Sequence, residues 1–209
     1  MSIKSDREYR NLGSFEMREA QDDAKEYRVS GYASTFEPYL LFEIDGTECY
    51  ERIDRSAFDD ADLSDVVFLR DHEGEVFARN KNGTLTLTVD DRGLFTETDL
   101  SSTTGSREMY EGIEAGLYSQ MSFAFTVADD GEEMEENADG SFTRVIKRFK
   151  KLYDVSAVSF PANPSTNIGI DARGAFNGEI EKRTAERLAA EIRKREREKL
   201  KLKIKMLEV

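Results

Sequence analysis

The sequence contains few of the residues that usually carry covalent or metal chemistry. Its 209 residues include one histidine, one cysteine, three prolines and no tryptophan. A single cysteine, Cys49, excludes an internal disulfide and a zinc site built from thiolates. Cys49 lies in the polar segment GTECYERI, with no second histidine to act as its base, so we expect it not to be catalytic. Any chemistry that needs an imidazole must use His72, the only one in the chain.

Long apolar runs are absent as well. No apolar segment approaches the roughly 18 to 20 residues that a membrane helix needs. The start of the chain, MSIKSDREYRN, lacks the apolar stretch of a secretory signal. We therefore expect a soluble protein that is made in a cytoplasm and has no membrane partner.

Positive charge is scarce over most of the chain. The formal net charge is −13, which argues against nucleic acid as a direct partner because phosphate binding needs a basic surface. Residues 181–209 nevertheless contain 11 Lys and Arg against 6 Glu, a net of +5. This leaves 19 basic against 37 acidic residues, a net of −18, in residues 1–180. The two parts should attract one another or attract different partners.

Length and composition predict one globular domain with an appendage. The chain is 38% hydrophobic and 35% charged, which is enough apolar material for one core of ordinary size. After FPANPSTNIGIDARGAFNG the sequence has no more Gly, Asn or Pro, the residues that interrupt helices and strands. Strong helix formers follow almost without interruption. We predict a domain at residues 1–178 and a basic helical tail at residues 179–209.

The predicted tail helix carries a discontinuous apolar stripe. The stripe consists of Leu188, Ile192, Leu200, Ile204 and Leu207. Such a helix should be long, exposed and dependent on a partner. Two interpretations stay open, namely a solvated charged helix without a specific role and a docking or coiled-coil segment. The junction IDARGAFNGEIEKR should be exposed and is an expected site of proteolytic cutting.

Most of the body is predicted to be β-structure. Apolar residues and threonines alternate over residues 83–89, DDRG supplies turn chemistry, and a second run follows at residues 94–100. This pattern indicates a hairpin. Residues 27–36 are a further strand candidate.

The second half of the body is predicted to contain a helix, two strands and a loop. The segment 106–116 predicts a short helix, because Met109 and Ile113 are four residues apart and a glycine follows. Strands are expected over residues 119–127 and 141–160. The acidic segment between them lacks the fixed spacing of a calcium loop, so we interpret it as a solvated loop.

These two later strands carry polar residues on one face. In SQMSFAFTV the large apolar side chains share one face by the period of two, and Ser122 shares the other with Ala124 and Thr126. In LYDVSAVSFP, Asp154 and Ser156 lie opposite the apolar residues. An acid in an apolar strand is costly if it is buried without a partner.

The residues permit a hydrolase of the serine type. Serine is a weak nucleophile until a base takes its proton, and an imidazole oriented by a carboxylate is the usual base. His72 is the one candidate for that base. Spacing alone does not single out this chemistry, since a serine, a histidine and an aspartate occur in almost any chain.

Five segments in order resemble the tailed-phage prohead proteases, the capsid maturation enzymes related to herpesvirus assemblins. The segments are VSGYASTF, SAFDDADLSDVVFLRDHEG, GTLTLTVDDRGLFTETDL, GIEAGLYSQMSFAF and LYDVSAVSFPANPSTN, and they run from about residue 28 to residue 167. The resemblance implies that His72 in RDHEG is the general base and that Ser122 in MSFAF is the nucleophile. The acidic position before the PANP element corresponds to Asp154, the implied third member.

The chain departs from the family pattern beside these residues. Asp71 replaces the asparagine before the histidine, and Ala124 replaces the glycine of the serine element, which affects the width of the cleft. The assemblins use a second histidine as third member, which this chain does not have. Asp71 and Glu73 flank His72, but adjacent side chains of an extended segment point to opposite sides, so Asp154 is the preferred orienter.

The resemblance implies a mainly β, α+β fold, namely a closed β-barrel with flanking helices, to which the charged C-terminal helix is added. It also implies acyl transfer, with backbone amides or an arginine stabilising the oxyanion. The sequence does not identify these donors, although Arg144 and Arg148 precede Asp154 in the predicted strand. No metal or organic cofactor is needed.

The resemblance also implies partners and a location. The substrates would be the scaffold and major coat proteins of a phage and the protease itself. The protease would be packaged inside the immature capsid, or prohead, in the host cytoplasm. Self-association stays open.

Two rival interpretations remain. A catalytically inactive homologue would keep the fold and the tail and act as a capsid scaffold or assembly module. A Ser-Lys hydrolase would instead use Lys147, Lys150 or Lys151, which are near Asp154 in sequence.

Overall fold

The chain divides into two compact units, residues 1–169 and residues 170–209. The computed structural model describes residues 7–17, 27–159 and 170–207. The first unit contains all the described strands, the helix α1 (Thr104–Glu114) and the short 3₁₀ helices η1 (Arg55–Phe58) and η2 (Asn80–Asn82). The PANPSTN part of the segments that carry the resemblance lies outside the described residues.

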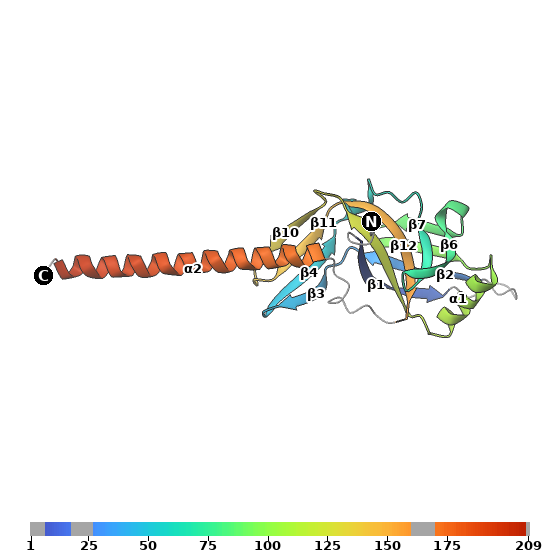
Figure 1. Ribbon diagram of the computed structural model, residues 1–209, viewed down its shortest axis with the longest axis horizontal. Coiled ribbons are helices and arrows are strands. Elements are labelled where there is room, and N and C mark those ends of the chain that lie inside the picture. The colour runs from blue at the N-terminus through green and yellow to red at the C-terminus, as the bar shows by residue number, and fades with distance from the viewer. Residues whose placement is uncertain (1–6, 18–26, 160–169, 208–209) are drawn as a thin grey trace. The chain divides into compact units, whose positions relative to one another are not determined.

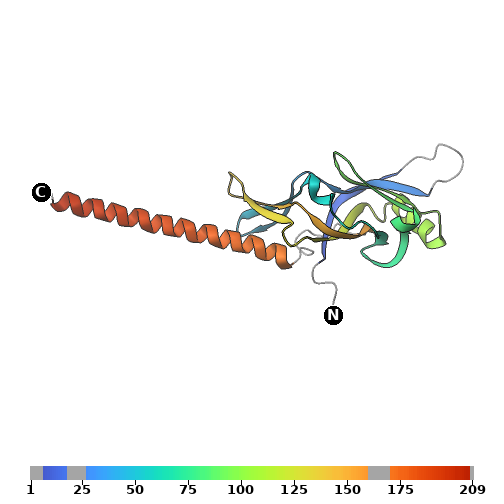
Figure 2. The same ribbon diagram turned by 90° about the horizontal axis from the view of Figure 1, so that it is seen from above.

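The second unit is the helix α2 (Ile170–Leu207), which Figure 2 shows as one uninterrupted helix. It begins before residue 179, where the predicted tail starts. Leu188, Ile192 and Leu200 of the predicted stripe are 58%, 50% and 60% exposed, whereas the side chains of the remaining two stripe residues lie outside the described set. Within the part of the chain that the structure describes, neither helix combines the length and hydropathy needed to cross a bilayer.

Eight strands form the larger sheet, in the order β6-β5-β12-β9-β1-β2-β8-β7 (Figure 1). They are β1 (Glu8–Met17), β2 (Arg28–Thr35), β5 (Val67–Arg70), β6 (Glu73–Arg79), β7 (Leu85–Val89), β8 (Gly93–Asp99), β9 (Gln120–Val127) and β12 (Phe149–Val158). The predicted hairpin is confirmed as β7 and β8, and the predicted strands at 27–36 and 119–127 are confirmed as β2 and β9.

Apolar side chains from the larger sheet and α1 pack into one cluster. Phe123 and Phe125 of β9 are fully buried, with ring centroids 4.9 Å apart. Met109 and Ile113 of α1 join the cluster, as their spacing of four residues predicted. The end strands β6 and β7 contribute to the same cluster through Phe77 and other side chains. One core therefore supports both ends of the larger sheet.

The predicted closed barrel is not found, because no ladder joins the end strands β6 and β7 among the described residues. After β6 the chain turns through η2 and through Gly83, which has a φ of 78°. The Arg79 N–H donates to the Thr84 side-chain oxygen at 2.9 Å instead of to a backbone carbonyl across a ladder. The mainly β, α+β class is confirmed, with a sheet that the hydrogen bonds leave open.

Four strands form the smaller sheet, in the order β10-β11-β4-β3. They are β3 (Tyr39–Ile44), β4 (Thr47–Ile53), β10 (Glu132–Glu136) and β11 (Phe142–Ile146). Residues 141–160 therefore form two strands, β11 and β12, and not the single strand expected.

The middle of the acidic segment is a strand, whereas its composition had predicted a solvated loop throughout. Its residues 132–136 pair with β11 as β10, which lies at the edge of the smaller sheet. Glutamates on this edge strand form ion pairs with basic residues, such as the pair between Lys147 and Glu133 at 2.5 Å. Charged side chains are a common feature of edge strands, where they discourage pairing with other chains.

Candidate active site

Two neighbouring strands bring a serine and a carboxylate onto the same face of the larger sheet. β9 and β12 are antiparallel, with Ser122 opposite Ser156 and Ala124 opposite Asp154. Directly paired residues project to the same face, so Asp154 lies diagonally across from Ser122. Diagonal neighbours are about 7–8 Å apart, which leaves room for a planar side chain between them. The face assignment made from the period of two is confirmed.

The imidazole of His72 fills this space. Its Nε2 atom lies 2.6 Å from the Ser122 Oγ, and its Nδ1 atom lies 2.6 Å from the Asp154 Oδ1. A carboxylate accepts hydrogen bonds and cannot donate them, so Nδ1 carries the proton in this arrangement. The lone pair of Nε2 then faces the serine hydroxyl. The structure brings the three predicted residues into one hydrogen-bonded chain.

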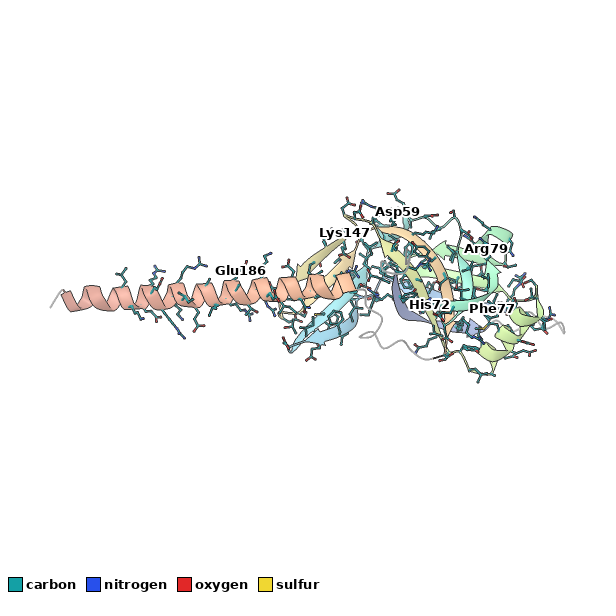
Figure 3. The ribbon with its side chains drawn as sticks, viewed as in Figure 1. Asp59, His72, Phe77, Arg79, Lys147 and Glu186 are labelled. Carbon is teal, nitrogen blue, oxygen red and sulfur yellow. The ribbon has the colours of Figure 1, made fainter. Side chains whose placement is uncertain are left out.

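A tight turn holds His72 in this position. β5 runs parallel to β12, with Arg70 opposite Ala157, and it connects to β6 through Asp71 and His72 alone. These two residues have φ values of 50° and 60°, as both central positions of a type I′ hairpin turn require. The imidazole therefore projects from the tip of a two-residue turn beside β12 (Figure 3).

Asp71 anchors this turn and does not orient the imidazole. Its N–H donates to the Ala157 carbonyl at 2.9 Å. Its carboxylate accepts from the backbone N–H and from the hydroxyl of Ser159, both at 2.8 Å. The predicted preference for Asp154 over Asp71 as the partner of His72 agrees with these contacts.

Ser156 completes the surroundings of the Asp154 carboxylate. Its hydroxyl donates to the Asp154 Oδ1 at 2.7 Å, the same oxygen that contacts His72. Asp154 is 2% exposed, and both Ser156 and Ser122 are fully buried. The cost of burying this carboxylate is therefore offset by two donors. The pattern of alternating faces had placed Ser156 beside Asp154 but gave it no role.

Tyr9 is a neighbour of the site that the sequence did not indicate. It lies on β1 opposite Ala124, and its ring meets the His72 ring edge to face at 4.6 Å between centroids. Ala124, at the position where the family pattern has glycine, is fully buried. Tyr9 thus packs against the imidazole, whose side chain is 13% exposed.

Glu8 and Arg10, the residues on either side of Tyr9, belong to a buried network of ion pairs. Arg10 donates to Glu51 at 2.5 Å and to Glu8 at 2.6 Å, and Arg144 donates to the same two carboxylates at 2.7 Å. Burial by itself would raise the pKa of Glu51, but the charges of Arg10 and Arg144 outweigh it and lower this pKa to about 2. The network ties β1 of the larger sheet to β4 and β11 of the smaller one.

The two arginines that precede Asp154 in sequence have other partners. Arg144 is 2% exposed, and its guanidinium donates hydrogen bonds to Glu8, Glu51 and Glu132. Burial tends to lower the pKa of Arg144, yet the hydrogen bond to Glu8 and the charges of Glu51 and Glu8 raise it above the ordinary value. Arg148 pairs with Asp130.

Two of the three lysines of the rival mechanism also contact carboxylates. Lys147 pairs with Glu133, and Lys151 pairs with Asp62 at 2.6 Å. Lys150 is exposed on β12. Among the described residues, no group of three or more His, Cys, Asp or Glu side chains is arranged to hold a metal ion.

A serine, an imidazole and a carboxylate bonded in this order are the groups that serine hydrolases use. The model of the caudovirus prohead serine protease family matches residues 14–179. The chain belongs to this family, so the predicted resemblance is confirmed. Membership implies a serine protease of phage capsid maturation. No curated protein and no solved structure gives a significant match.

Proposed function

We propose that the protein is a serine endopeptidase that cleaves the scaffold and coat proteins of a phage prohead through Ser122, His72 and Asp154. The observation that carries the proposal is the hydrogen-bonded chain from Asp154 through His72 to Ser122, with 2.6 Å at each link. Family membership supports the reaction class and the capsid proteins as substrates.

In the proposed mechanism Ser122 Oγ attacks the carbonyl carbon of the peptide bond while His72 Nε2 takes the hydroxyl proton. His72 then gives that proton to the leaving nitrogen, the C–N bond breaks, and an acyl-enzyme remains. Water attacks the acyl carbon, loses its proton to His72 and releases the carboxyl product. The proton finally returns to Ser122. Asp154 holds the tautomer and stabilises the imidazolium.

Backbone N–H groups are the proposed oxyanion donors. The alternative donors, Arg144 and Arg148, are bound to carboxylates. Ser156 acts as a positioning residue, because its hydroxyl fixes the Asp154 oxygen that faces His72. A carboxylate fixed by two donors keeps one orientation during the proton transfers.

The partners and the location follow from the same proposal. The protease acts on scaffold and major coat protein inside the immature capsid, in the host cytoplasm, and it also cleaves itself. Residues 179–209 dock onto scaffold or coat protein through the exposed apolar residues and positive charge of α2. Cutting near the start of α2 would release this segment.

A catalytically inactive assembly module is the second candidate. The observation that favours it is that Ser122 has no exposed surface in this structure. A protease must therefore rearrange around Ser122 before a substrate enters. The Ser-Lys mechanism is not favoured, because the described contacts of Lys147 and Lys151 are with carboxylates.

Co-expression with the coat and scaffold proteins of the phage separates the two candidates. Mass spectrometry should find trimmed proteins with the parent chain and intact ones with Ser122→Ala. Ser102→Ala, which changes an exposed serine of a loop, is the matched control and should cleave like the parent. Trimming by Ser122→Ala to the same extent as by the parent would favour the assembly module.

A further inference from the structure

A cavity of about 460 Å³ lies between β6, α1 and the segment that leads into β9. We propose that this cavity is the specificity pocket of the protease and that it receives a lysine or arginine side chain of the substrate. The inference rests on the proposed function, whose site residues do not line the cavity. The volume falls in the range of about 300–1,000 Å³ that is usual for ligand pockets.

The cavity adjoins both segments that deliver catalytic groups. Arg70, the last residue of β5, lines it and is two residues before His72. Tyr118 lines it and is four residues before Ser122. The Arg70 guanidinium donates to the Tyr118 hydroxyl at 3.5 Å, which links the two segments at the wall of the cavity.

Two glycines of α1 make room for the cavity wall. A Cβ atom at Gly112 would lie 2.7 Å from the Tyr118 ring, and one at Gly105 would lie 2.8 Å from the Glu75 carboxylate. Neither distance is compatible with a side chain unless the neighbour moves. Glycine is less favourable than alanine inside a helix, so Gly112 weakens α1 but permits the close approach of Tyr118.

The lining combines an apolar floor with an acidic rim. Phe77 and Met109 are 7% and 3% exposed and form the apolar floor, whereas Leu117, at 65% exposed, is an apolar residue at the mouth of the cavity. Glu108 and Glu111 are exposed glutamates on α1 that line the same cavity. Lysine and arginine side chains have an apolar stem and a terminal cation. The stem would contact the apolar floor and the cation would contact the acidic rim.

An acidic substrate side chain would meet repulsion at the same place. The cavity has three carboxylates, from Glu75, Glu108 and Glu111, and one cation, from Arg70. That cation is already bonded to Tyr118. The net charge of the lining is therefore negative, which attracts a cationic side chain and repels an anionic one.

The test is the cleavage of a peptide library by the full chain, read by mass spectrometry. We expect cleaved peptides to be enriched in lysine or arginine at one fixed position relative to the cut by about 10-fold or more. Cleavage with no basic preference at any position would overturn the pocket and leave the proposed function intact. Failure to cleave any peptide or phage protein would overturn both.

A double variant, Glu108→Gln with Glu111→Gln, tests the residues. It should lower kcat/KM for a lysine-containing peptide by about 10- to 100-fold, as expected for loss of charged hydrogen bonds. The value for the same peptide with methionine in place of lysine should change little. Glu43→Gln, an exposed glutamate on β3 in the other sheet, is the matched control. Equal losses for both peptides would contradict the assignment and indicate a structural role for the rim.

Discussion

His72 and its neighbour Asp71 hold a backbone conformation that residues with side chains rarely adopt. Both have positive φ, and this region costs roughly 1–2 kcal/mol for a residue other than glycine. The cost is offset by the bonds from Asp71 to Ala157 and Ser159. Strained backbone conformations cluster at active sites because the surrounding structure fixes them. The base is therefore placed by a turn that its neighbour stabilises.

The first prediction concerns Asp71 as an anchor of this turn. Asp71→Ala removes the bonds to Ser159, so kcat should fall by about 10-fold or more while KM changes little. Asp71→Asn keeps an acceptor and tolerates positive φ, so it should retain most of the activity. Steady-state kinetics on one peptide substrate would measure this. Equal losses in both variants would mean that the negative charge, and not the anchoring, is what matters.

A second prediction concerns Asp154. Asp154→Asn keeps the shape but offers His72 a neutral group that favours the wrong tautomer, so turnover should fall by about 10³- to 10⁴-fold. The loss should be smaller than in Ser122→Ala, and the unfolding temperature should change little. Ser156→Ala, which removes only the second donor, should cost about 10-fold. If Asp154→Asn unfolds the protein without a separate catalytic defect, Asp154 is a structural residue.

The three residues of the site could be predicted from the sequence, but the contacts that support them could not. His72 had no competitor in the chain, and the resemblance pointed to Ser122 and Asp154. Tyr9 was missed because β1 has no clear alternation of apolar residues. The anchoring by Asp71 was missed because positive φ at two residues with side chains is not visible as a pattern of hydrophobicity.

At the scale of the elements, the strands with regular alternation were predictable and the charged ones were not. The hairpin of β7 and β8 followed from threonines that alternate with apolar residues. β10 consists almost entirely of glutamates, so its composition indicated a loop. Its pairing with β11 depends on a partner strand that local propensity does not encode.

The buried ion network gives a third prediction, which concerns stability against pH. The pKa of Glu51 is lowered in the folded protein from an ordinary value of 4.5 to about 2. A lowered carboxyl pKa stabilises the fold above the unfolded value and loses this effect as the pH falls through the folded value. The unfolding temperature should therefore drop between about pH 4.5 and pH 2. Calorimetry over this range would measure the drop.

Glu51→Gln tests whether this residue is responsible. Removing one partner of a buried pair usually costs about 3–5 kcal/mol, so the variant should be less stable at neutral pH and less sensitive to acid. Glu48→Gln, an exposed position on the same strand, is the control and should unfold like the parent. A variant at Glu51 that keeps the full acid sensitivity would place its origin in other carboxylates.

At the scale of the whole molecule, the body and α2 differ in charge and in packing. Residues 1–180 carry a net of −18, with 19 basic against 37 acidic residues, whereas α2 exposes apolar residues among basic ones. The chain divides at residue 170, while the change in composition had indicated residue 179. Gly174 and Gly178, which precede the predicted start of the tail, lie inside α2.

The fourth prediction concerns the tail. A chain ending at Gly178 should remain soluble and unfold near the parent temperature, because the core cluster lies in the body. It should keep its peptidase activity but fail to enter proheads, since the proposed docking segment is gone. Sedimentation of assembled proheads followed by immunoblotting would measure packaging. Packaging equal to that of the full chain would leave the tail as a solvated helix without a docking role.

The measurement that tests the central claim most directly is the labelling of the full chain with a fluorophosphonate, followed by peptide mapping. The account predicts a single adduct on Ser122. It also predicts that His72→Ala slows labelling by about three orders of magnitude or more, because the serine loses its base. An adduct on another serine, or labelling of Ser122 at the parent rate in His72→Ala, would contradict it.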